Sequence, residues 1–213
     1  MPDPAESPRL TIVSESPRPD RMRGLAVFLH GWTGDEHSME VLDAGLAPGW
    51  WRVAPRAPFA ASAGGYSWSS DPERPGASLE SYGMAIEAMR ETVDRLDHAS
   101  EVPVVLVGFS QGSAVALGAA AAGGIRPAGV AVLSGFLPTG CEPRALAGLP
   151  VFWSHGIKDP LVSVDRARAD SRRLELGGAR LTYCEADVGH KVGLPCVRGL
   201  RAWLIHLERD SKA

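Results

Sequence analysis

The 213-residue sequence lacks the features that mark membrane, secreted and nucleic-acid-binding proteins. No window approaches the roughly 18 consecutive apolar residues of a transmembrane helix, so we expect no membrane span. Residues 1–21 contain neither a basic segment nor an apolar core, so no secretory signal is visible. The formal net charge of −3 offers no basic surface, so nucleic acid is not an expected partner.

Cysteine is scarce, and no cofactor motif accompanies it. Cys141, Cys184 and Cys196 are odd in number and show no framework spacing, which predicts a reducing, cytoplasmic location. Cys184, His190 and Cys196 are evenly spaced, but no fourth ligand completes a zinc site. A solvated helix N-terminus explains the acids of residues 35–37 without a metal. No dinucleotide-binding or Walker A sequence follows a strand, so we expect neither a metal nor an organic cofactor.

The pattern that is present is an alternation of short apolar strands and amphipathic helices. A hydrophobic content of 45% and a charged content of 22% are ordinary for a globular protein of one domain. Strands alternating with helices predict an α/β fold over residues 1–213, with a mostly parallel central sheet and helices on both faces. We expect a loose start over residues 1–20 and a long loop over residues 55–78. The expected strands are 10–14, 24–30, 51–54, 102–107, 129–134, 151–155 and 180–185, and the expected helices are 37–46, 79–98, 111–122, 164–176 and 196–209.

The most informative stretch covers residues 102–123, which predict a strand, a sharp turn and a helix. The turn, Gly108–Gly112, has the sequence GFSQG and matches the G-x-S-x-G of a nucleophile elbow. In such an elbow the serine has strained backbone geometry, and the flanking glycines let the strand and helix approach each other. Ser110 is therefore the candidate nucleophile. The alternative is a glycine-flanked turn whose serine only caps the helix.

Two later residues match the partners that a serine nucleophile needs. A serine hydroxyl requires a base and a third group that orients the base, and in this fold the acid precedes the histidine. Asp159 follows one predicted strand, and His190 lies in the loop after the next. Both are expected at the carboxyl ends of the strands, as is Ser110. Asp187 is a rival acid because it lies close to His190 in the sequence. Helices, caps or strand ends account for the histidines His37, His98, His155 and His206.

The oxyanion formed by attack of Ser110 also needs hydrogen-bond donors. One expected donor is the backbone N–H of Gln111, the residue after the nucleophile. The second is expected from the turn at residues 30–34, with the N–H of Trp32 as the best candidate. The alternative for that segment is a plain tight turn.

The chain resembles the phospholipase/carboxylesterase family of α/β-hydrolases, which includes bacterial carboxylesterases and acyl-protein thioesterases. The matching pieces are Phe28-Leu29-His30-Gly31, Gly108-Phe109-Ser110-Gln111-Gly112, Asp159-Pro160-Leu161-Val162 and Gly189-His190. The resemblance implies an α/β-hydrolase fold with Ser110 as nucleophile, His190 as base, Asp159 as its orienter, and an oxyanion hole at Trp32 and Gln111. Two departures are Ser113, where members usually carry a second glycine, and HGWTGD at residues 30–35, where they usually read HGLGD.

The same resemblance places the loop containing Tyr66 and Trp68 near the acyl pocket. These two aromatic residues either bind substrate or cover the core beneath a long loop. A bulky Trp32 beside the oxyanion predicts a narrow site that favours short acyl groups.

The sequence thus predicts a serine carboxylesterase that hydrolyses short- to medium-chain esters through an acyl-enzyme. An acyl-protein thioesterase or lysophospholipase on the same triad is one alternative, and amide cleavage is another. A non-catalytic α/β-hydrolase scaffold that serves as a binding module is the alternative from a different class. The expected partner is a small-molecule ester. A homodimer is compatible with the sequence, although no patch identifies its interface.

Overall fold

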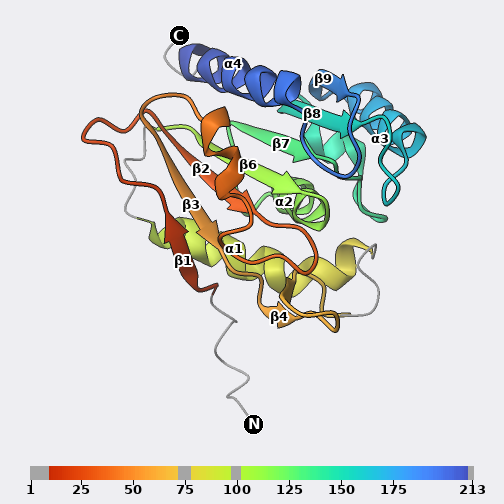
Figure 1. The fold of residues 1–213 in the computed structure, drawn as a ribbon, viewed down its shortest axis with the longest axis horizontal. Helices are drawn as coiled ribbons and strands as arrows, with labels where there is room; N and C mark the ends of the chain where they lie inside the picture. The colour runs from red at the N-terminus through yellow and green to blue at the C-terminus, as the bar shows by residue number, and fades with distance from the viewer. Residues whose placement is uncertain (1–9, 72–77, 97–101, 211–213) are drawn as a thin grey trace.

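The computed structural model describes residues 10–71, 78–96 and 102–210. Within this part, seven strands form one sheet in the order β1-β3-β2-β6-β7-β8-β9. β1 runs antiparallel to β3, and all the other neighbours run parallel (Figure 1). The strands are β1 (Ile12–Glu15), β2 (Gly24–Leu29), β3 (Trp50–Pro55), β6 (Val104–Phe109), β7 (Gly129–Leu133), β8 (Pro150–Gly156) and β9 (Arg180–Ala186).

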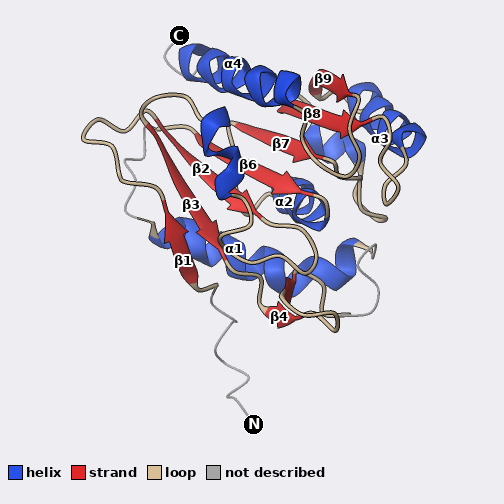
Figure 2. Cartoon of the chain, viewed as in Figure 1, coloured by secondary structure: helices blue, strands red, loops and turns tan. Residues whose placement is uncertain are grey.

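Helices cover both faces of this sheet, as the sequence predicts (Figure 2). α1, α2 and α3 pack on one face, and α4 packs on the other together with the short helix η1. No helix in the described part of the chain is long and apolar enough to cross a membrane. The helices are η1 (Glu40–Gly45), η2 (Leu79–Tyr82), α1 (Gly83–Arg95), α2 (Gln111–Ala121), η3 (Pro143–Leu146), α3 (Val164–Leu176) and α4 (Leu194–Asp210).

Side chains of the central strands alternate between two hydrophobic clusters. In β2, Leu25, Val27 and Leu29 pack in the cluster with α1, α2 and α3. Ala26 and Phe28 pack in the cluster with α4. A strand buried on both faces has no polar side to present, which is why the sequence shows a continuous apolar run here instead of an alternation.

The predicted strands are all confirmed, with small shifts at their ends. The segment predicted as a helix over residues 37–46 is instead the short 3-10 helix η1. The helix predicted over residues 79–98 divides into η2 and α1, and His98 lies outside the described residues. Short 3-10 turns are common where a helix begins or where two elements connect, and apolar periodicity does not distinguish them from α-helix.

The segment predicted as a long loop contains a small hairpin. β4 (Phe59–Ala60) and β5 (Tyr66–Ser67) pair antiparallel, while residues 72–77 lie outside the described part. Both strands are two residues long, too short for a periodic signal in the sequence. An isolated bridge between Gly34 and Tyr66 joins this hairpin to the turn that follows β2.

Candidate active site

Ser110 lies at a sharp turn between β6 and α2. Its backbone has φ 51° and ψ −115°, a conformation that residues with a side chain rarely adopt. The N–H of Ser110 donates to the carbonyl of Leu133 at the end of the neighbouring strand β7, at 2.9 Å. The strained geometry expected of a nucleophile elbow is therefore present.

The two glycines of the GFSQG sequence are required by close backbone approach. A Cβ at Gly108 would lie 2.3 Å from the carbonyl oxygen of Gly112, and a Cβ at Gly112 would lie 2.1 Å from that of Leu29. Any side chain at either position would push α2 away from the sheet. Ser113, one of the departures from the family pattern, is accommodated because its hydroxyl donates to the Gly108 carbonyl at 2.7 Å.

Asp159 follows β8 and is held by hydrogen bonds at both carboxylate oxygens. Its Oδ1 accepts the N–H groups of Leu161 and Val162 at 2.9 and 3.0 Å, and its Oδ2 accepts a hydrogen bond from Nδ1 of His190 at 2.7 Å. Burial by itself raises the pKa of this carboxyl, but hydrogen bonds from Val162, His190 and Leu161 outweigh it and lower the pKa below its ordinary value. Asp159 is therefore ionised at neutral pH.

His190 lies in the segment between β9 and α4, which we call the β9 loop (residues 187–193). Its imidazole lies beside the ring of Phe109, with centroids 5.0 Å apart, so the β9 loop reaches across to the elbow. The hydrogen bonds of the described residues include none between Ser110 and His190. The structure thus pairs the predicted acid with the predicted base and places that base next to the residue preceding the predicted nucleophile.

Residues 30–34 form the turn that follows β2, which we call the β2 loop, and hydrogen bonds of His30 hold it in place. The imidazole of His30 is buried; its Nδ1 donates to the Gly31 carbonyl at 2.7 Å, and its Nε2 accepts the N–H of Ala57 at 3.1 Å. Burial lowers the pKa of His30, in keeping with a neutral ring. In the described part of the chain, neither the Trp32 N–H nor the Gln111 N–H has a hydrogen-bond partner.

Trp68 and Tyr66 support the β2 loop. Trp68 is fully buried, and its indole N–H donates to the His30 carbonyl at 2.7 Å. Its backbone N–H donates to the side-chain oxygen of Gln111 at 2.9 Å. Tyr66 exchanges backbone hydrogen bonds with Thr33 and Gly34. Of the two interpretations for Trp68, its lack of exposed surface and its hydrogen bond to the β2 loop favour the one in which it covers the core.

A mainly apolar cavity of about 440 Å³ adjoins the β2 loop. Neither Tyr66 nor Trp68 lines it. Its wall includes Trp32 and Phe109 from the two turns, and side chains from η1 and the start of α4 that the sequence analysis did not assign. The apolar spacing in residues 37–46 was the sequence feature that could have indicated these lining residues. That spacing does not specify which cavity the side chains face. The unassigned apolar lining residues are Met39, Val41, Leu42, Val192, Leu194 and Val197.

The sequence reasoning also missed a role for His155. This buried histidine donates from Nε2 to the carbonyl of Val162 at 2.8 Å and lies 3.5 Å from Oδ2 of Asp159. It therefore supports the turn that carries the acid. The rival acid Asp187 is exposed and pairs with Lys158 at 2.7 Å, away from His190.

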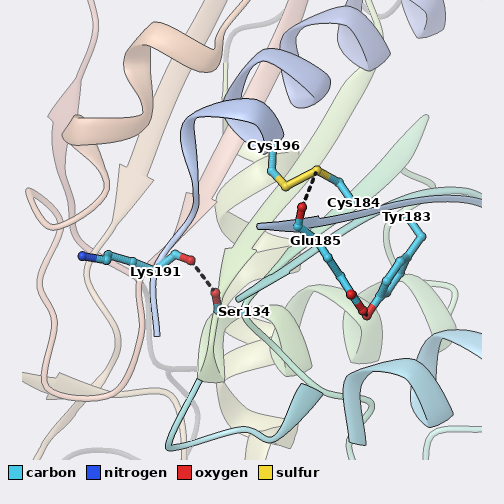
Figure 3. Close-up of a disulfide and its surroundings, with 6 residues drawn as sticks. All are labelled: Ser134, Tyr183, Cys184, Glu185, Lys191 and Cys196. Atoms are coloured by element: carbon cyan, nitrogen blue, oxygen red, sulfur yellow. Dashed lines mark hydrogen bonds between the residues drawn. A yellow bond between two sulfur atoms is a disulfide. The ribbon is translucent and has the colours of Figure 1, made fainter. Parts of the chain in front are cut away.

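Cys184 and Cys196 form a disulfide, although the odd number and spacing of the cysteines suggested a reducing location (Figure 3). The bond joins β9 to α4, and Cys141 is free and buried. Two cysteines twelve residues apart in one sequence gave no framework pattern, and only the packing of α4 on β9 brings them together. The pairing removes the cysteine argument for a cytoplasmic location, and it occupies two of the sulfur atoms considered for zinc.

The acids after the β2 loop are also accounted for. Glu36 is buried and accepts a two-point hydrogen bond from the Arg56 guanidinium, with Nε to Oε2 at 2.7 Å. Hydrogen bonds from Arg56 lower the pKa of Glu36 to about 2. Arg56 also lies over the ring of Tyr66, 4.6 Å from its centroid. No group of three or more candidate metal ligands occurs among the residues described.

Known proteins resemble the chain in both sequence and fold. The sequence profile of the phospholipase/carboxylesterase family matches residues 12–191. A probable carboxylesterase of Oryza sativa subsp. japonica is 28% identical over 168 residues, covering 71% of this chain and 62% of that protein. The crystal structure of esterase PE8 superposes with a TM-score of 0.75 at 25% identity, covering 93% of this chain and 99% of that one. Acyl-protein thioesterase 2 of Zea mays superposes with a TM-score of 0.76 at 17% identity, covering 92% and 98%.

Proposed function

We propose that this chain, which belongs to the phospholipase/carboxylesterase family, is a serine hydrolase that cleaves short- to medium-chain carboxylic esters through an acyl-enzyme. The observation that carries the proposal is the 2.7 Å pairing of His190 with Asp159 beside Phe109, the residue before Ser110. The strained backbone of Ser110 adds to it. The chain order serine, aspartate, histidine is the one this fold uses.

In the proposed reaction, Ser110 Oγ attacks the ester carbonyl while Nε2 of His190 takes the hydroxyl proton. Nδ1 of His190 faces the ionised Asp159 carboxylate and therefore carries the ring proton, which leaves Nε2 free to act as the base. The carboxylate also stabilises the imidazolium that forms. His190 then returns the proton to the leaving alcohol, and a water molecule repeats the cycle to release the acid.

The backbone N–H groups of Trp32 and Gln111 are the proposed oxyanion donors. Both lie in turns at the carboxyl edge of the sheet, and neither has another partner within the described residues. Each such donor typically lowers the barrier by about 3–4 kcal/mol. Gln111 also opens α2, whose N-terminus favours negative charge.

The cavity beside the β2 loop is the proposed site for the acyl group. Its volume of about 440 Å³ lies within the range of roughly 300–1,000 Å³ that is usual for small-molecule pockets. Trp32 in its wall supports short- to medium-chain substrates. The exposed Val41 and Leu194 at its rim favour the second candidate, a lysophospholipase or thioesterase that takes a longer acyl chain.

The test is hydrolysis of p-nitrophenyl esters from acetyl to decanoyl by the wild type and by Ser110→Ala. We expect activity in the wild type and a loss of about 10³-fold or more in the variant, because removal of the nucleophile leaves only binding and the oxyanion hole. Ser81→Ala is the matched control and should retain most activity, because the Ser81 hydroxyl is at an exposed site and donates to the Ser78 carbonyl within its own turn. A faster rate on decanoyl than on butyryl esters would contradict the short-chain preference.

Reaction with a fluorophosphonate separates the enzyme from a silent scaffold. Covalent modification of Ser110 in the wild type, absent from Ser110→Ala, is the expected result. Activity that survives in Ser110→Ala would show that another residue is the nucleophile. If the wild type neither hydrolyses esters or thioesters nor reacts with the probe, the binding-module alternative is correct.

A further inference from the structure

The β9 loop leaves the sheet at its edge. Among the described strands, β9 pairs with β8 on one side and has no strand on the other. The backbone contacts of the segment that follows lie towards β8: the N–H groups of Ile157 and Lys158 donate to the carbonyls of Ala186 and Val188. The loop runs from this edge towards the elbow, where His190 lies beside Phe109, so its course depends on how its two ends are held.

The disulfide supplies an anchor on the other side. Cys184 belongs to β9 and Cys196 to the first turns of α4, so the bond joins the two elements that flank the β9 loop (Figure 3). His190 lies midway between the two cysteines in the sequence. The disulfide thus closes a ring of chain with the proposed catalytic base at its centre.

Within this ring, the chain is also held by non-covalent contacts. Val192 packs in the cluster with α4, and the Gly189 backbone approaches Gly156 so closely that a Cβ at Gly156 would lie 2.1 Å from the Gly189 carbonyl oxygen. The Ser134 hydroxyl donates to the Lys191 carbonyl at 3.2 Å, with the lysine side chain directed away from the disulfide (Figure 3). Asp187 pairs with Lys158 at the surface, where both side chains are more than half exposed. Exposed ion pairs contribute little because water screens them. The segment that presents His190 to Asp159 is therefore held by these contacts together with the disulfide that joins its two flanking elements.

We propose that Cys184 and Cys196 are positioning residues, whose disulfide holds the β9 loop so that His190 keeps its alignment between Asp159 and the elbow. The inference rests on the proposed function for its catalytic consequence. Closing a flexible segment reduces the conformations open to it. A displacement of about 1 Å in a catalytic group can lower a rate by about 100-fold, so a loosened loop is expected to have a measurable effect.

Cys141 is not an exchange partner for this bond. It is buried, and burial raises the pKa of its thiol to about 11, so it is almost entirely protonated at neutral pH. Cys184 is half-buried and offers the accessible sulfur of the pair. The protein therefore contains one reducible bond in its described part, and that bond flanks the proposed base.

The experiment compares the oxidised wild type with the same protein reduced by tris(2-carboxyethyl)phosphine. Phosphorus gives two electrons to the disulfide and takes the oxygen of one water, whose two protons go to the released sulfurs. One phosphine oxide and two thiols form, and alkylation with mass measurement counts the thiols. Circular dichroism confirms that the reduced protein is folded at the assay temperature.

Two readouts are followed in the reduced protein. The first is hydrolysis of acetyl and butyryl esters, for which we expect kcat to fall by about 10- to 100-fold, equally for both, with recovery on reoxidation. The second is amide hydrogen exchange, which we expect to rise in residues 187–193 and to stay unchanged in residues 30–34. A merely stabilising bond would alter the melting temperature without changing kcat of the folded protein.

A double variant, Cys184→Ser with Cys196→Ala, repeats the test without reductant. Alanine is used at position 196 because Cys196 is buried among apolar side chains. Asp187→Asn is the matched control: it removes an exposed contact of the same loop and should leave kcat within about twofold.

The outcomes separate this inference from the proposed function. If reduction changes neither kcat nor amide exchange, the inference is overturned and the proposed function is unaffected. A loss of activity confined to the longer ester would also overturn the inference, because it would mean that the disulfide shapes the cavity. If amide exchange in the β9 loop becomes faster on reduction but the oxidised wild type has no hydrolase activity, the role of the disulfide in holding the loop is supported and the proposed function is overturned.

Discussion

The β2 loop and the β9 loop lie at the same edge of one sheet but are held in different ways. The β2 loop is enclosed: the indole of Trp68 bonds to the His30 carbonyl, and Tyr66 pairs with it through the backbone. The β9 loop has hydrogen bonds towards β8 and packing of Val192 in the cluster with α4, and a disulfide joins the two elements that flank it. One loop is stabilised by buried polar contacts, and the other by non-covalent contacts together with a crosslink between its flanking elements.

The difference follows from the position of each strand in the sheet. β2 lies between β3 and β6, so neighbouring turns and the β4–β5 hairpin surround the loop that follows it. Among the described strands β9 lies at the edge of the sheet, and the loop that follows it runs inward to the elbow. No described strand lies beyond β9, and the disulfide between β9 and α4 adds a covalent attachment at this edge.

Of the substitutions that test this comparison, Gly112→Ala is expected to have the largest effect on activity. Its Cβ would lie 2.1 Å from the Leu29 carbonyl, so the variant displaces the elbow and the β2 loop together. We expect kcat to fall by about 100-fold or more and stability to fall by about 1–3 kcal/mol, measured by ester hydrolysis and urea unfolding. Amide exchange in the β9 loop should stay unchanged.

Gly83→Ala is the matched control for that variant. Nothing lies within 4 Å of a Cβ at Gly83, the first residue of α1, so this substitution should leave activity intact and stability equal or slightly higher. Equal activity losses in the two variants would contradict the packing argument.

Trp68→Phe is expected to have an intermediate effect. A smaller aromatic ring replaces the indole, and the buried carbonyl of His30 loses the N–H that it accepts at 2.7 Å. An unsatisfied buried acceptor costs about 1–3 kcal/mol of unfolding free energy. We expect that loss in urea unfolding, a several-fold decrease in kcat, and faster amide exchange in the β2 loop alone.

Trp153→Phe provides the comparison for Trp68. Trp153 is also fully buried, but its indole N–H has no hydrogen-bond partner within the described residues. Its replacement should therefore leave kcat and β2-loop exchange unchanged. If both variants loosen the β2 loop alike, the hydrogen bond to His30 is not what holds it.

Glu36→Gln is expected to have the smallest effect on activity and a pH-dependent effect on stability. The pKa of Glu36 is about 2 in the folded protein, whereas its ordinary value is 4.5. The ion pair with Arg56 therefore stabilises the fold fully above pH 4.5, and this stabilisation is lost as the pH falls towards 2. At pH 7 the variant should lose about 1–3 kcal/mol in urea unfolding. That difference should shrink below pH 4.5. Glu87→Gln, whose pair with Arg90 is exposed, should show little change.

Much of this architecture was predictable because local patterns specify it. Continuous apolar runs such as Gly24–Leu29 indicate strands buried on both faces, and the glycines around Ser110 predict the elbow. The pairing of His190 with Asp159 follows from the chain order of this fold. The hairpin β4–β5 was not predictable, because two-residue strands leave no period to detect.

The sequence by itself determined the strands and the elbow turn, since each depends on residue types close together in the chain, and the chain order of the fold predicted that Asp159 and His190 would pair. Only the tertiary structure decided the partners of Trp68, the support of His155 for Asp159, and the bond between Cys184 and Cys196. These contacts depend on which elements pack together at the edge and centre of the sheet. The spacing of residues in the sequence does not specify that packing, because side chains far apart in the chain come into contact only when the helices pack on the sheet.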